Sequence, residues 1–283
     1  MKKFFHYTLL IALCTLLFAG CGSGDKPADD AGKVKLGMIT RLNASEENFG
    51  KFMEQVEATL EVKISSHAPV FFDSLNAMQM ALQSKQIDEI STYRSVARYM
   101  LAKDPRFVSL KDHSLEFIDS FCFALRDDET ELRDSLNMII KEMQADGTLD
   151  RLTKEYITDI NAESEPPAVE LPHFDSAKTI KIAVTGDLPP LDYVSADGKP
   201  AGFNTAVLAE IGNRMLRNID LVQIESGARA ASLTSKQVDV VFWAIVPVSE
   251  IIPQDSDKPD GVILSEPYYK DKIVHLIFQA EKN

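Results

Sequence analysis

The feature that most constrains the fold is an alternation of apolar runs and helical segments in residues 179–244. Three apolar runs are typical of buried strands: residues 180–184, 220–224 and 238–243. Between them a helix is expected from about Asn204, and a shorter helix that Ser226 would cap runs through Leu233. Strands that alternate with helices indicate an α/β sheet, and such sheets bind ligands at the carboxyl ends of their strands.

The same stretch and the residues after it carry five short motifs. They are the run 180–184, Pro189-Pro190-Leu191, Asp197-Gly198-Lys199 followed by Gly202-Phe203-Asn204, the run 238–241, and Ser265-Glu266-Pro267-Tyr268-Tyr269. In this order and spacing, the motifs resemble the first lobe of the family 3 extracellular solute-binding proteins. The resemblance implies a two-lobed α/β fold of the type II periplasmic-binding-protein kind. Proteins of this family deliver amino acids and related polar solutes to membrane transporters.

Residues 34–125 resemble the second lobe of the same family. Gly37 and a threonine-containing loop precede an expected helix, and residues 72–88 resemble the family's passage from a strand through a helix to the next strand. A first-lobe-like domain then covers residues 126–283. The family normally places its first lobe before its second, so the order here is swapped.

The swap is explained by the order of segments after residue 125. The closing helices at 131–157 come first, then a proline-rich acidic linker at 161–177, then the core at 179–283. The linker would join the family's carboxyl end to its amino end, which indicates a circular permutation. The strands at 121–125 and 273–278 should then lie side by side as the crossings between lobes. The alternative is a fusion of two partial receptors completed by a partner chain.

The amino terminus has the pattern of an export signal. Two lysines precede an apolar stretch at 7–19, which is too short for a comfortable membrane span. Leu17-Phe18-Ala19-Gly20-Cys21 resembles a bacterial lipoprotein box, so residues 1–21 are expected to be a signal peptide ending at a lipidated Cys21. Residues 22–33 would form a flexible tether. The alternative is an ordinary secretory peptide with an incidental cysteine.

Charge and composition exclude several classes of partner and site. A formal net charge of −13 argues against nucleic acid or an anionic lipid surface as partner. Outside the signal segment, Cys122 is the one remaining cysteine, so no disulfide is expected. The histidines outside the signal have no ligand spacing, and the sequence therefore predicts no metal site and no cofactor: His67, His113, His173 and His275.

The family resemblance places a solute in the cleft between the lobes. Nine residues next to expected strand or helix ends are ligand candidates: Asp187, Leu188, Trp243, Ala244 and Ile245 on the first lobe, and Thr40, Arg41, Asn43 and Tyr93 on the second. Trp243 would stack on an apolar or cationic solute, Asp187 would hold an ammonium group, and Arg41 would grip a carboxylate. The structural alternatives are core packing for Trp243, a backbone-bonded turn for Asp187 and a solvated surface charge for Arg41.

Two departures from the family bear on the ligand. Amino-acid receptors of the family carry an arginine for the α-carboxylate soon after the third strand, and residues 247–250 contain none. They also carry an aspartate for the α-amino group where this chain has Tyr93. Because a buried zwitterion without paired charges is costly, a standard α-amino acid is not the favoured ligand.

The leading hypothesis is a monomeric substrate-binding lipoprotein of an ABC-type importer. It would be exported, anchored to the cell envelope through its lipid, and partnered by the transporter's permease. Hinge closure would capture a small polar solute of the amino-acid or derivative class. One alternative is an enzyme like the periplasmic cyclohexadienyl dehydratases, with Asp187 as its acid–base residue. The other is a sensory or scaffold homologue that transports nothing and whose cleft stays empty.

Overall fold

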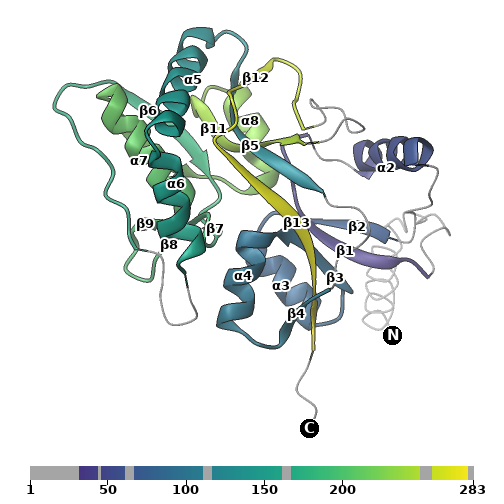
Figure 1. Ribbon diagram of the computed structural model, residues 1–283. Helices are drawn as coiled ribbons and strands as arrows, with labels where there is room; N and C mark the ends of the chain where they lie inside the picture. The colour runs from purple at the N-terminus through teal and green to yellow at the C-terminus, as the bar shows by residue number, and fades with distance from the viewer. Residues whose placement is uncertain are drawn as a thin grey trace, which may run out of the picture. The chain divides into compact units, whose positions relative to one another are not determined.

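Two long strands, β5 (Ile118–Arg126) and β13 (Tyr269–Phe278), organise the molecule. In the computed structural model the sheet order is β10-β6-β11-β5-β13-β3-β1-β2, with β12 beside β5 and β4 beside β13 (Figure 1). The structure describes residues 32–43, 46–60, 67–110, 117–160, 167–248 and 257–279. The predicted signal peptide, the lipidated Cys21, most of the tether and the start of the linker lie outside these ranges.

The amino-terminal half is built on one sheet. Its strands are β1 (Val34–Ile39), β2 (His67–Phe72), β3 (Glu89–Tyr93), β4 (Phe107–Ser109) and the end of β13. Its helices are α2 (Glu46–Leu60), α3 (Leu75–Gln83) and α4 (Arg94–Lys103). Ser74 caps α3 by accepting a hydrogen bond from the Ala77 amide. Gly37 lets α3 pack closely on β1, since a Cβ there would lie 3.1 Å from Cγ of Met78 on α3.

The carboxyl-terminal half is built on a second sheet. Its strands are β5, β6 (Thr179–Val184), β10 (Asn218–Gln223), β11 (Val240–Pro247) and β12 (Val262–Leu264), together with the start of β13. β6 runs parallel to β10 and β11, as alternating strands and helices predict. A small sheet joins β7 (Asp187–Leu188), β8 (Asp192–Val194) and β9 (Pro200–Ala201).

The helices of this half follow the predicted order. They are α5 (Thr130–Ala145), α6 (Thr148–Thr153), the π-helical turn η1 (Lys154–Thr158), α7 (Phe203–Met215), the 3₁₀ turn η2 (Ser226–Ala228) and α8 (Arg229–Thr234). Gly147 separates α5 from α6 with a φ of 77°, the left-handed conformation that commonly ends a helix. Ser226 was expected to cap the short helix, but its side chain makes no capping bond, and η2 begins after Glu225.

The prediction that the two crossing strands lie side by side is confirmed. Residues Tyr269 to Lys272 of β13 pair antiparallel with Ile118 to Phe121 of β5. Residues 273–278 pair instead with β3 and β4, so the register differs from the expected pairing of 121–125 with 273–278. One strand thus belongs to both sheets because its two ends have different neighbours. Lys33–Asn283 form a single compact unit.

β11 is longer than the sequence indicates. Its apolar run was expected to end at Trp243, which would leave Ala244 and Ile245 in a loop. The strand continues to Pro247, and Ala244 and Ile245 pair with Cys122 and Phe121 of β5. A bulge between Val241 and Ala244 makes this possible, with Trp243 at a φ of 70°. Among the described residues, no helix has the length and apolar character needed to cross a membrane.

Candidate ligand-binding crease

We call the place where the two halves meet beside β5 and β13 the crease; its residues include Thr40, Tyr93, Asp119, Arg229 and Trp243. Arg229, the first residue of α8, is fully buried there. Its guanidinium donates to the carbonyl oxygens of Phe242 and Trp243 at 3.4 and 3.2 Å. It also donates to the Thr40 carbonyl, in the amino-terminal half, at 3.2 Å. Arg229 therefore ties the two halves together through backbone oxygens.

The charge of Arg229 is held by an aromatic face and by carboxylates at longer range. Its Cζ lies 4.6 Å from the centroid of the Trp243 ring, a cation–π contact. Burial lowers the pKa of Arg229, whereas the nearby carboxylates of Asp257 and Asp192 raise it. The crease therefore contains a buried cation whose donors are bonded to carbonyl oxygens.

Asp119, on β5, gathers two of the predicted ligand residues. Its Oδ2 lies 3.2 Å from Nη2 of Arg41 and accepts a hydrogen bond from the Tyr93 hydroxyl at 3.0 Å. The Tyr93 ring packs edge-on against Phe121 and Trp243, with centroids 4.7 and 6.1 Å away. The structure therefore brings Arg41, Tyr93 and Trp243 together. Arg41, however, pairs with a carboxylate of the protein itself.

Asp257 links the predicted residues Asn43 and Ile245. It accepts hydrogen bonds from the Asn43 amide at 3.0 Å and from the Ile245 amide at 3.2 Å, and so joins the two halves. Burial raises the pKa of Asp257 to about 6, and the nearby Arg41 opposes this rise.

Asp187 bridges the halves at a second point. Its Oδ2 accepts a hydrogen bond of 2.7 Å from the amide of Leu75, the first residue of α3. Helix amino termini favour anions because their first amides have no partners within the helix. Asp187, predicted to hold an ammonium group or to bond within its own turn, instead places its carboxylate at a helix terminus of the other half. Burial raises its pKa and the bond from Leu75 lowers it.

Close approach of the backbone supports this second bridge. The Gly227 amide donates to Oδ1 of Asp73 at 2.9 Å. A Cβ on Gly227 would lie 2.7 Å from that oxygen, so any larger residue would displace the Asp73 carboxylate.

Asp192, on β8, lies buried behind Asp187. It accepts hydrogen bonds from the amides of Thr185 and Gly186 at 3.0 and 2.7 Å. Burial raises its pKa to about 7, and the Asp187 carboxylate adds to the rise. Asp192 therefore changes charge near neutral pH.

Three of the predicted ligand residues have side chains that pack in the core or bond the protein's own backbone. Leu188 and Ala244 are buried in the two hydrophobic clusters of the protein. Thr40 donates from both its amide and its hydroxyl to the Phe72 carbonyl. Of the polar atoms of Thr40 in the described structure, only the carbonyl oxygen reaches the crease, where it accepts from Arg229.

Two buried donors beside Arg229 have no hydrogen-bond partner among the described residues. They are Nε1 of Trp243 and Oγ of Ser226. Each leaves about 1–3 kcal/mol of desolvation uncompensated, so a polar group bound at the crease would satisfy them.

The sequence interpretation missed Arg229, Asp119, Asp192 and Asp257. A weak signal existed for Arg229, which is four positions before the buried Leu233 and therefore on the same helix face. Asp119 stood out as a charge within an apolar strand. No local pattern marked the other two. Asp257 is defined by packing between distant segments, and Asp192 by the turn that brings its carboxylate back to Thr185 and Gly186.

Two cavities lie near the crossing strands. One, of about 200 Å³, opens between α4 and η1 and is lined by Ser95, Tyr99, Ile157 and Pro190. The other, of about 700 Å³, is lined by Ser120, Cys122, Asn137, Pro247 and Lys270. Neither is lined by Arg229 or Trp243, because side chains of the protein itself fill the crease around these two residues.

Comparisons with solved structures give low similarity over most of the chain. A ligand-binding component of an ABC-type import system from Staphylococcus aureus, with zinc bound, is 10% identical with a TM-score of 0.42, and the match covers 86% of this chain and 65% of that one. Peb3 from Campylobacter jejuni is 12% identical over 87% of both chains, with a TM-score of 0.41. A nutrient binding protein from Burkholderia cenocepacia, bound to methionine, is 10% identical over 87% and 84%, with a TM-score of 0.37.

Comparison with sequence families is more specific. No curated protein matches the chain. Residues 180–275 match the bacterial extracellular solute-binding proteins, family 3. The matched segment contains β6 through most of β13, and therefore Asp187, Arg229 and Trp243. The match to this family is confined to this segment of the carboxyl-terminal half.

Proposed function

We propose that the protein is the substrate-binding component of an ABC-type importer. Its solute would be small and polar, of the amino-acid or derivative class, and would bind at the crease. The observation that carries the proposal is the pair of buried, unpartnered donors of Trp243 and Ser226 beside Arg229, within the segment that matches the family.

Hinge closure follows from the kind of contact at the crease. The polar contacts that join the halves include Asp187 with Leu75, Asp73 with Gly227, and Arg229 with Thr40. When the halves separate, hydrogen bonds to water can replace each of these contacts. The contacts alone therefore do not keep the halves closed. A solute with an acidic group would take the place of the Asp187 carboxylate at α3, and its polar groups would satisfy Trp243 and Ser226.

The remaining parts of the proposal concern topology and location. The swapped order of the lobes is a circular permutation, and the paired β5 and β13 support it. The chain is exported and monomeric, and Cys21 carries a lipid that anchors it near the permease. Release of a lipid-modified amino-terminal peptide, detected by mass spectrometry, tests the anchor.

Calorimetry and thermal-shift screening against amino acids, amines and small peptides test the proposed binding. We expect a hit that Trp243→Phe and Ser226→Ala weaken without loss of folding, because each removes one unpartnered donor. Ser135→Ala on α5 is the matched control, since its hydroxyl bonds only within its own helix among the described residues. Flat results on folded protein contradict the proposal.

A second candidate function is that of a sensory or scaffold homologue that transports no solute and whose cleft stays empty. A specific observation favours it. Tyr93, Asp119, Arg229 and Trp243 are each 5% exposed or less, so the crease is filled by the protein itself. This candidate predicts that no solute binds and that the halves stay closed. The enzyme alternative depended on Asp187, whose carboxylate bonds the Leu75 amide, and we do not propose it.

A further inference from the structure

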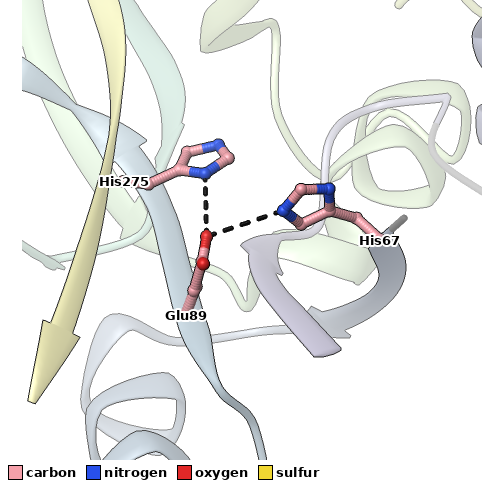
Figure 2. Close-up of side chains that lie close together, drawn as sticks. All are labelled: His67, Glu89 and His275. Carbon is pink, nitrogen blue, oxygen red and sulfur yellow. Dashed lines mark hydrogen bonds and ion pairs between the residues drawn. The ribbon is translucent and has the colours of Figure 1, made fainter. Parts of the chain in front are cut away.

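Two histidines and a glutamate from separate strands meet on the amino-terminal sheet. His275 Nδ1 lies 3.0 Å from Oε2 of Glu89, and His67 Nε2 lies 3.7 Å from the same oxygen. The two rings stand edge-to-face with centroids 5.9 Å apart. Figure 2 shows both rings directed at the Glu89 carboxylate. One ligand atom from each residue lies within 4.8 Å of the others.

Strand register places the three side chains on one face. His275 pairs with Ser91, two positions from Glu89 along β3, so His275 and Glu89 point to the same side. Glu89 pairs with Leu36 of β1, and His67 pairs with Val34, two positions earlier. His67 therefore shares that face. The cluster depends on the backbone pairing of β2, β1, β3 and β13, which fixes its spacing.

The cluster is separate from the crease. Glu89 begins β3 and Tyr93 ends it, so about 13 Å of extended strand lies between them. A ligand at the cluster would therefore not contact the solute proposed above, and its binding can be measured independently of that solute.

The donor set suits a borderline divalent cation. Two imidazole nitrogens and one carboxylate oxygen are ligands that zinc takes at about 2.0–2.2 Å, which places neighbouring ligand atoms about 3.3 Å apart. The separations of 3.0 and 3.7 Å from the Glu89 oxygen to His275 and His67 bracket this value. The side chains of His67, Glu89 and His275 are 18%, 14% and 16% exposed, so the cluster is shielded but open to an entering ion. Calcium and magnesium prefer oxygen ligands.

We propose that His67, Glu89 and His275 bind one Zn²⁺ ion, with solvent as the fourth ligand. The ion would join β13 to β2 across the two strands between them. It would thereby fasten the carboxyl-terminal strand to the amino-terminal sheet. Such a clamp stabilises the folded chain because the unfolded chain does not hold the three ligands together.

The test uses the full chain purified without a histidine tag and stripped of metal with a chelator. Titration with Zn²⁺ against a chromophoric chelator should show one competing site per chain. Glu89→Gln and His275→Gln should each weaken this binding at least about 100-fold, since even outer partners of metal ligands contribute about 10–100-fold. His173→Gln is the matched control, because His173 is an exposed histidine beside a single carboxylate, Asp175. It should leave the titration unchanged.

Two readouts keep the proposal falsifiable if a variant fails to fold. Zn²⁺ should raise the melting temperature of the wild-type chain, and Mg²⁺ should not. Co²⁺-loaded wild type should give the intense visible bands of a four-coordinate site. The proposal is overturned if folded wild type binds no Zn²⁺, if Glu89→Gln and His275→Gln titrate like His173→Gln, or if bound Co²⁺ gives the weak spectrum of its hexa-aqua ion.

Discussion

The two halves bring different kinds of groups to the crease. The carboxyl-terminal half contributes buried charged and aromatic side chains, namely Arg229, Trp243, Asp192 and Asp257. The amino-terminal half contributes mostly backbone: the amides of Leu75 and Asn43 and the carbonyl of Thr40. Its side-chain contributions include Arg41 and Tyr93, which both end on Asp119 of β5, and Asp73, which accepts from the Gly227 amide.

This difference indicates a division of roles. Charges that are fixed within one half, such as Arg229 and Asp192, keep their positions when the other half moves away. The backbone amides and carbonyls of the amino-terminal half can bond any carboxylate or donor that lies opposite them. They therefore contribute more to closure of the halves than to selectivity for a solute. Recognition should therefore depend on the carboxyl-terminal half.

Replacement of the buried cation tests this division most strongly. Arg229→Met should lower the free energy of unfolding by about 3–5 kcal/mol, because it leaves buried carboxylates without a compensating charge and carbonyl oxygens without a donor. Chemical denaturation measures the effect. Arg133→Met is the matched control, since Arg133 is a partly exposed arginine of α5 that pairs with the adjacent Asp134. Equal losses in the free energy of unfolding from the two substitutions would contradict the prediction that the buried charge of Arg229 stabilises the crease.

The pH dependence of stability tests the buried acid of the same half. In the folded chain the pKa of Asp192 is about 7, against about 3.9 in an unfolded chain. Between these values the folded state binds the extra proton, so the free energy of unfolding should fall as pH rises from about 4 to about 7. The slope from this group reaches about 1.4 kcal/mol per pH unit. Asp257 acts in the same direction, with a pKa of about 6.

Asp192→Asn should reduce that slope, because the amide mimics the protonated acid. Denaturation at a series of pH values measures it, and Asp220→Asn on exposed β10 should leave the curve unchanged. Asp146, whose pKa is lowered to about 2 by bonds from Thr148 and Arg214, contributes only below about pH 4 and does not obscure the window. An unaltered slope in Asp192→Asn would contradict the assignment.

The smallest effect is expected at the start of α3, where Asp187 of the other half caps the helix with one hydrogen bond. Asp187→Ala removes the acceptor for the Leu75 amide and should lower the free energy of unfolding by about 1 kcal/mol. Hydrogen exchange at the start of α3 should speed up at the same time. Asp187→Asn keeps an acceptor and should restore most of the protection. If exchange in α3 stays the same in Asp187→Ala, the bridge between the halves is not formed in solution.

Local patterns predicted the elements better than the site. The apolar run at 180–184 became β6 (Thr179–Val184), and the strand pair β5 and β13 formed, because hydrophobic periodicity is local. Trp243 and Arg41 were predicted as ligand residues from their places at expected strand ends, and this role stays a prediction. The roles of Arg229 and Asp257 arise from packing between segments far apart in the chain. His67 and His275 lie near opposite ends of the sequence, so linear spacing could not show their meeting with Glu89.

The claim that the halves close around a solute is tested most directly by a distance measured across the crease. Met80 on α3 and Met138 on α5 are exposed and belong to different halves, so a Met80→Cys, Met138→Cys chain can carry two spin labels, while Cys122 is buried. We predict a broad distribution of distances without solute, which a bound solute from the amino-acid screen narrows to its short component. A single narrow distance that no member of the screen changes would contradict the account.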